Sequence, residues 1–238
     1  MSLQEGRELP IFPERMRVFS GSVLKLIAIL AMLIDHTAVC FSPGADLTLF
    51  SLGGKAFTLY AILRYVGRIA FPLFVFLLVE GFRHTKSRRR YGIRLFLFAL
   101  ISEIPYNLFR SGNWLDSKQN VFFTLLLGYL ALCALESKHK KWAALEIVAL
   151  FAVAFFLKAD YGYAGFVFIL LAYALCKMPL FGAMMSACVL SIASAAAFIP
   201  IGLYNGERGF ARTRTVSYLF YVFYPLHLLV LALMKILL

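Results

Sequence analysis

Long apolar segments separated by short polar breaks make up most of this chain of 238 residues. A helix of about 20 apolar residues crosses the hydrocarbon core of a bilayer and satisfies its own backbone hydrogen bonds there. The pattern therefore predicts an all-α fold, a polytopic transmembrane helical bundle of about eight spans. The expected spans are residues 23–41, 69–82, 91–109, 121–135, 142–157, 163–176, 180–199 and 216–238.

Two segments depart from this pattern. Residues 56–68 are apolar but contain Arg64 and Arg68, so we expect an interfacial or partly re-entrant helix that leads into the second span. Residues 1–20 are polar, and no small-residue cleavage site follows the first apolar run, which is unlike a secretory signal peptide. We therefore expect a polar cytoplasmic arm, residues 1–20, followed by a single integral membrane domain, residues 21–238.

The charge distribution refines this topology. The chain has a net charge of +12, with dense basic runs at residues 83–90 and 136–142. The positive-inside rule places these runs and both termini in the cytoplasm, and it explains the charge without a nucleic-acid partner. One loop disagrees, because residues 205–215 carry three arginines and the span count places them outside. The run at 83–90 has a second interpretation, the capture of phosphates of a cytosolic nucleotide-bearing cofactor.

Asp35 and His36 are adjacent within the first apolar segment. An ionisable group in hydrocarbon costs about 2.5–3.5 kcal/mol, so such residues usually face a cavity and a partner. Adjacent helical residues point about 100° apart, so we expect His36 to meet a carboxylate across the bundle, such as Glu103. The imidazole is a candidate general base, oriented by Asp35 or Glu103, and a structural hydrogen bond between helices is an equal alternative.

Other polar side chains fall at the same depth as His36, in the outer half of the predicted bundle. Each has an ordinary structural interpretation, such as an arginine at the interface, a loop cap or a polar contact between helices. Their concentration predicts one polar cavity that opens outward and binds substrate or cofactor. These candidates are Arg64, Arg68, Tyr106, Asn107, Asp160, Tyr161, Asn205 and His227. The four cysteines are scattered without a CxxC pair, and we expect no metal site.

Several of these residues lie in blocks that resemble the TraX family. The blocks occur in the same order and read LKLIAILAMLIDHTAVCF, RYVGRIAFPLFVFLLVEGFRHT, RLFLFALISEIPYNLF, ADYGYAG, YNGERG and YLFYVFYPLHLLVL. The resemblance implies a multi-pass protein of the bacterial cytoplasmic membrane, whose family namesake acetylates the N-terminal amine of conjugative pilin. The family is similar to larger membrane acyltransferases of surface polysaccharides, in which a histidine at the position of His36 is thought to be catalytic. Residues 1–20 and 42–55 lie outside the matching blocks.

The leading hypothesis is an O- or N-acyltransferase that uses acetyl-CoA, with His36 as general base and Asp35 or Glu103 orienting it. Arg64 and Arg68 would bind charge or stabilise an oxyanion. The acceptor would be an envelope molecule, either a pilin-like protein or a glycan. Two alternatives remain open: a proton-coupled small transporter or flippase that uses the same polar residues, and a non-catalytic pilus or envelope assembly factor.

Overall fold

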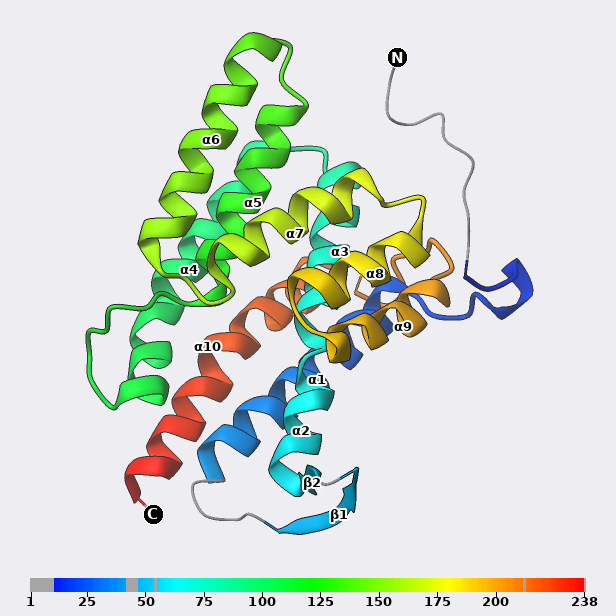
Figure 1. Ribbon diagram of the computed structural model, residues 1–238. Coiled ribbons are helices and arrows are strands. Elements are labelled where there is room, and N and C mark those ends of the chain that lie inside the picture. Colours follow the sequence, from blue (N-terminus) through cyan, green and yellow to red (C-terminus); the bar gives the residue numbers. More distant parts are fainter. Residues whose placement is uncertain (1–10, 42–46, 54, 212, 238) are drawn as a thin grey trace.

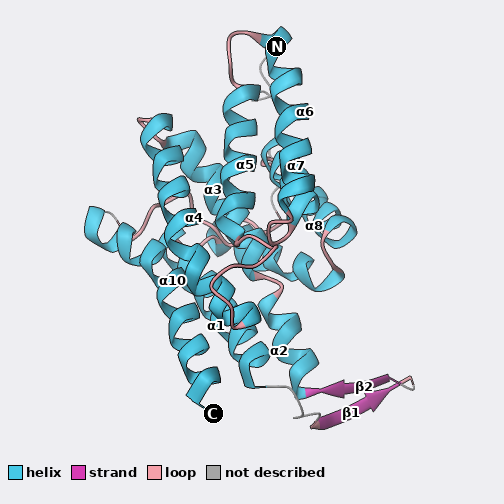
Figure 2. Cartoon of the chain, turned by 90° about the vertical axis from the view of Figure 1, so that its left-hand side faces the viewer, coloured by secondary structure: helices cyan, strands magenta, loops and turns pink. Residues whose placement is uncertain are grey.

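The computed structural model describes residues 11–41, 47–53, 55–211 and 213–237. Half of the predicted polar arm, residues 1–10, lies outside this part of the chain. The described residues are mainly helical, with one short β-hairpin at one end of the molecule (Figures 1 and 2). The elements are η1 (Glu14–Met16), α1 (Gly21–Phe41), β1 (Thr48–Leu52), β2 (Lys55–Thr58), α2 (Leu59–Gly67), α3 (Ala70–His84), α4 (Arg88–Ser111), α5 (Val121–Leu135), α6 (Lys140–Leu157), α7 (Gly162–Ala174), α8 (Pro179–Val189), η2 (Ile192–Ala197), α9 (Phe198–Gly202) and α10 (Arg214–Leu237).

Local sequence signals explain where several helices begin and end. Thr58 caps α2 and Ser87 caps α4, each by accepting a hydrogen bond from a backbone N–H of the first turn. Asn120 caps α5 in the same way. The α4 helix ends at Gly112, whose φ of 73° is left-handed and favours glycine. These caps set the lengths of the helices that carry the polar residues discussed below.

Four helical segments among the described residues have the length and hydropathy of membrane spans: Gly21–Phe41, Leu59–His84, Arg88–Ser111 and Thr215–Leu237. They indicate an integral membrane protein with an all-helical bundle. The other apolar helices, Val121–Leu135, Gly162–Ala174, Pro179–Val189 and Ile192–Gly202, are shorter. The predicted count of eight spans is therefore not confirmed. In particular, the span predicted over residues 180–199 is interrupted between α8 and η2, where Leu190 and Ser191 leave the helix.

The interfacial or partly re-entrant helix predicted over residues 56–68 begins at Leu59 and leads into the second predicted span, while its place relative to the membrane stays a prediction. Residues 56–58 belong to strand β2, and α2 continues into α3 as one apolar helical segment with a bend at Arg68 and Ile69. Backbone bonds such as Ile69 N–H to the carbonyl of Val66 (3.3 Å) carry the helix through the bend. Pro72 fits there because a proline in a first helical turn gives up a donor that needs no intrahelical partner.

Helices α1 and α10 lie side by side and run in the same direction (Figure 1). Near their N-terminal ends, the Lys25 ammonium lies 5.4 Å from the centre of the Phe220 ring. Near their C-terminal ends, Cys40 Sγ donates to the carbonyl of Leu231 (3.4 Å). If both helices cross the bilayer, the N-terminal arm and the C-terminus lie on opposite sides. The prediction that both termini are cytoplasmic is not confirmed, and this parallel arrangement argues against it.

The structure also explains the loop at residues 205–215, whose arginines disagreed with the positive-inside rule. Gly21 N–H donates to the carbonyl of Glu207 (2.8 Å), and Ser22 Oγ donates to the carbonyl of Arg208 (2.7 Å). Ala211 N–H in turn donates to Ser22 Oγ (2.8 Å). The arginine-containing loop is therefore fastened to the N-terminal end of α1, beside the basic start of the chain, as the positive-inside rule requires.

Candidate functional site

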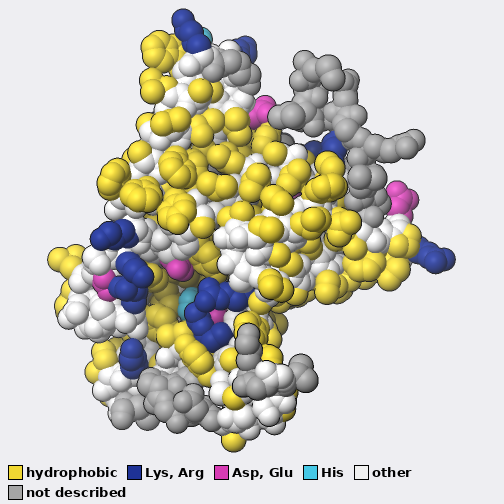
Figure 3. All heavy atoms as spheres, in the orientation of Figure 1, with side chains coloured by type: hydrophobic (Ala, Val, Ile, Leu, Met, Phe, Trp, Pro, Cys, Tyr) yellow, Lys and Arg dark blue, Asp and Glu magenta, His cyan; other side chains and the backbone are white. Residues whose placement is uncertain are grey.

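A cavity of about 180 Å³ lies in the half of the bundle near the C-terminal end of α1. Its walls come from helices α1, α2, α3, α4 and α10, the start of α5 and the connection between α6 and α7. Its polar lining consists of Asp35, His36, Arg64, Arg68, Tyr106, Arg110, Asp160, Tyr161 and Tyr224. Figure 3 shows a hollow on this face in which a histidine side chain is visible between basic side chains. A polar cavity is therefore present around Asp35 and His36, and the other seven polar side chains of its lining all come from elements other than α1.

Asp35 and His36 turn to different partners within this cavity. Asp35 Oδ2 accepts a hydrogen bond from Arg64 Nη1 at 2.5 Å, and the two side chains form an ion pair between α1 and α2. The close approach depends on Gly67, because a Cβ at that position would lie 2.2 Å from Asp35 Oδ1. Asp35 thus holds Arg64 in the wall of the cavity, and the expected orientation of His36 by Asp35 is not observed.

His36 pairs with a second histidine from the last helix. Its Nδ1 lies 2.7 Å from Nε2 of His227, and the two ring planes are inclined by 14°. The other nitrogen of His227, Nδ1, lies 2.9 Å from the backbone carbonyl of Phe223. His227 is buried behind His36 and is not part of the cavity lining. The structure therefore does not support the predicted direct contact between His227 and a substrate. The expected carboxylate partner of His36 is replaced by an imidazole.

Asp160 and Tyr161 enter the cavity from the connection between α6 and α7. Tyr161 stacks on Phe71 with 3.8 Å between ring centres. Burial raises the pKa of the Asp160 carboxyl, and the nearby Asp35 adds to this, whereas the Tyr161 backbone N–H and Arg68 lower it in part. Burial also raises the pKa of the Tyr161 hydroxyl, followed by the effect of Asp160. This side of the cavity therefore combines a carboxyl with a raised pKa and the guanidinium of Arg68.

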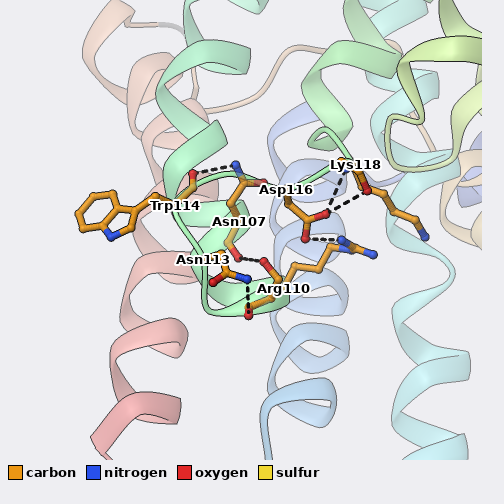
Figure 4. A network of polar contacts seen from close by, with 8 residues as sticks. Asn107, Arg110, Asn113, Trp114, Asp116 and Lys118 are labelled. Atoms are coloured by element: carbon orange, nitrogen blue, oxygen red, sulfur yellow. Dashed lines mark hydrogen bonds and ion pairs between the residues drawn. The ribbon is translucent and has the colours of Figure 1, made fainter.

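Three predicted site residues lie elsewhere. Glu103 accepts a hydrogen bond from Asn120 Nδ2 (2.6 Å) and ties α4 to the start of α5. Asn107 donates from Nδ2 to the carbonyl of Trp114 (3.2 Å) and holds the loop after α4 (Figure 4). Asn205 accepts from Glu207 N–H (2.9 Å) at the opposite end of α1. The sequence analysis grouped these residues by their expected depth in the bundle. In the structure, each one instead faces a loop that it stabilises.

Comparison with known proteins identifies the family. A family model described as TraX protein matches residues 20–235. The chain belongs to the TraX family. It is also 33% identical, over 245 aligned residues, to the probable fimbrial assembly protein FimC, serogroup H1, of Dichelobacter nodosus. That match covers 90% of this chain and 94% of the relative. No solved structure matches the chain.

Two polar cavity residues of this TraX protein, Arg110 and Tyr224, were not predicted from its sequence. Arg110 lies one helical turn after Tyr106 on α4, and it forms an ion pair with Asp116 in the following loop (Figure 4). Tyr224 precedes His227 by almost one turn on α10. Residues three or four positions apart share one face of a helix, and both residues lie at that spacing from a predicted one, Tyr106 or His227. This spacing was the signal in the sequence that would have identified them.

Proposed function

We propose that this protein is a membrane-embedded acyltransferase that moves an acetyl group from acetyl-CoA to an amine or hydroxyl of an envelope acceptor. The observation that carries the proposal is His36, an imidazole in the wall of a charged cavity with one nitrogen held by a neighbouring helix. Membership of the TraX family supports the reaction class. The name of the relative, a fimbrial assembly protein, favours a pilin-like acceptor over a surface glycan.

His36 would act as the general base. When bound, acetyl-CoA supplies the thioester carbonyl at which the acceptor is acylated. His36 takes the proton of the attacking amine or hydroxyl, and returns a proton to the sulfur as the carbon–sulfur bond breaks. Such a base contributes on the order of 10²–10⁴ in rate. Arg68, which forms no ion pair within 4.0 Å in the described part of the chain, would stabilise the negative charge that develops on the carbonyl oxygen.

The cavity suits the reacting end of the donor. Its volume of about 180 Å³ is below the roughly 300–1,000 Å³ typical of pockets that enclose a whole drug-sized ligand. The nucleotide part of the donor therefore needs a second place to bind.

A group of cations at the N-terminal end of α1 would provide that place. Lys25 lies close enough to Arg94 and Arg208 to experience the repulsion of both charges. Within the described residues, no acidic side chain forms an ion pair with any of the three. The buried Nε of Arg94 has no hydrogen-bond partner. Phosphate oxygens would satisfy this donor and relieve the repulsion. Lys25 and His36 are about 16 Å apart along α1, so one extended donor molecule would connect the two sites.

The test uses purified protein in lipid nanodiscs with radiolabelled acetyl-CoA. We expect slow thioester hydrolysis by the wild type and its loss in His36→Gln, with acetyl-CoA binding retained in both. The matched control is His139→Gln, an exposed histidine outside the cavity, which should hydrolyse at the wild-type rate. Equal hydrolysis by wild type and His36→Gln, or no binding of acetyl-CoA, would overturn the proposal. Proton-driven flux in liposomes without acyl-CoA would then support the transporter alternative.

A further inference from the structure

We propose that His227 is a positioning residue that fixes the tautomer of His36 and shares the proton that His36 takes up. This inference rests on the proposed function, which gives His36 the role of base. It arises from the pairing of two histidines that are 191 residues apart in the chain. The hydrogen bonds of the pair determine where each proton lies.

The backbone carbonyl of Phe223 decides the tautomer of His227. A carbonyl oxygen only accepts hydrogen bonds, so the nitrogen 2.9 Å from it, His227 Nδ1, must carry a hydrogen. In a neutral imidazole the other nitrogen is then an acceptor. His227 Nε2 therefore accepts from His36 Nδ1–H across the 2.7 Å contact. The consequence is that Nε2 of His36 is left with a free lone pair, which is the form that a general base requires.

Among the described residues, no carboxylate forms a hydrogen bond or an ion pair with His36. The nearest acid along the chain, Asp35, is engaged by Arg64. The ring of Phe109 from α4 lies 5.2 Å from the His36 ring, and that of Tyr224 from α10 lies 6.4 Å away. In serine proteases a carboxylate accepts this hydrogen bond from the catalytic histidine, and loss of the correct tautomer there costs about 10⁴-fold in rate. Here a neutral ring occupies the position of the carboxylate.

A second ring also allows the proton to be shared. When His36 Nε2 takes the proton of the acceptor, the Nδ1 proton can cross to His227 Nε2. His36 is then neutral, with the new proton on Nε2, and the positive charge resides on His227. The cation keeps its Nδ1–H bond to Phe223, so no hydrogen bond is lost. The reverse transfer restores the pair when His36 gives its proton to the leaving sulfur, and the proton count balances.

The first test reads the tautomer directly, independently of activity. Protein labelled with ¹⁵N-histidine is studied by solid-state NMR in lipid, and His36→Gln assigns the His36 signals by their absence. We expect Nδ1 of His36 to be protonated and Nε2 to be unprotonated at neutral pH. In His227→Leu, which removes the acceptor, we expect a mixture of both tautomers. A protonated Nε2 in the wild type would overturn the inference, whether or not the protein is an acyltransferase.

The second test measures turnover. His227→Leu should lower kcat by about 10²-fold or more, with little change in KM for acetyl-CoA, because His227 does not line the cavity. His227→Gln should recover at least part of this loss, because an amide oxygen accepts the His36 hydrogen bond. His139→Leu serves as the matched control. Wild-type kcat in a folded His227→Leu variant would overturn the inference, whereas activity in His36→Gln would instead overturn the proposed function. If His227→Leu fails to fold, the wild-type spectrum and His227→Gln still decide the question.

Discussion

Asp35 reaches Arg64 because the residue that faces it on α2 has no side chain. Gly67 lies where a Cβ would come within 2.2–2.6 Å of three Asp35 atoms, which no real structure accommodates without displacement. The ion pair is only partly shielded, since the side chains of Arg64 and Asp35 are 25% and 18% exposed. Its contribution is therefore more to the position of Arg64 than to the stability of the bundle. Residue size, rather than charge, determines whether this wall of the cavity can form.

The Gly67→Ala variant tests that argument. We expect it to separate α1 from α2, destabilise the protein by about 1–3 kcal/mol and reduce turnover, because overpacking displaces Asp35. Thermal unfolding in detergent and acetyl-CoA hydrolysis measure the two effects. Gly92→Ala is the matched control, since its added Cβ would meet Tyr129 only at an ordinary 3.5 Å. Equal melting temperatures for the two variants would contradict the close packing at Gly67.

Asp160 gives a prediction on pH. A carboxyl whose pKa is raised in the folded state holds its proton more strongly than in the unfolded state, where the pKa is about 3.9. The Asp160 carboxyl therefore stabilises the folded state below the unfolded-state pKa. This stabilisation is lost as the pH rises through the raised pKa of the folded state. We therefore expect Asp160→Asn to gain stability relative to the wild type as the pH rises above about 4. Melting temperatures of both proteins at a series of pH values provide the measurement, and a constant difference would refute the expectation.

The junction of α4 and α5 shows how an element, rather than a single residue, supports the site. Asn120 is fully buried, and its side-chain amide forms three hydrogen bonds. It donates to the carbonyl of Ala99 (2.8 Å) and to Glu103, and it accepts from Phe122 N–H (3.0 Å) to cap α5. These bonds join the two helices next to the segment of α4 that carries Tyr106 and Arg110. Glu103 therefore supports the cavity wall in this structure and does not line the cavity.

Loss of this junction should be measurable. We expect Asn120→Ala to cost about 2–4 kcal/mol, because it removes a helix cap and leaves buried groups without partners. The control is Asn113→Ala, which removes one exposed hydrogen bond of 3.4 Å and should be within about 0.5 kcal/mol of wild type. Glu103→Gln keeps an acceptor for Asn120 and should retain turnover. A loss of turnover in Glu103→Gln without a loss of stability would restore Glu103 as a reacting group.

At the scale of the whole molecule, the cations near Lys25 and the cavity with His36 lie at opposite ends of α1. The loop around Arg208 and the start of α4 adjoin its N-terminal end, where Lys25 also lies. The cavity with His36 adjoins its C-terminal end, together with the β1–β2 hairpin (Figure 2). Under the proposed function, a donor from the cytosol and an acceptor from the envelope would approach His36 from opposite sides. The positive-inside rule predicts that the N-terminal end of α1 faces the cytoplasm.

Cysteine labelling in cells tests that orientation. In a background without native cysteines, Glu207→Cys should react with a membrane-impermeant maleimide only after the membrane is permeabilised. Leu237→Cys, at the C-terminal end of α10, should react in intact spheroplasts. The sequence-based topology instead predicts that the C-terminus is protected in intact cells. Protection of both positions would contradict the parallel crossing of α1 and α10.

Hydropathy and charge were sufficient to predict the helical membrane class, most helix positions and a polar cavity around Asp35 and His36, because these depend on local composition and helical spacing. They did not predict that His36 meets His227, or that α1 and α10 run parallel. Such pairings depend on which helices pack together, and apolar surfaces do not encode that choice in any short segment. For the same reason Glu103 and Asn205 were assigned to the cavity by depth alone. Only packing shows which way a side chain at the right depth faces.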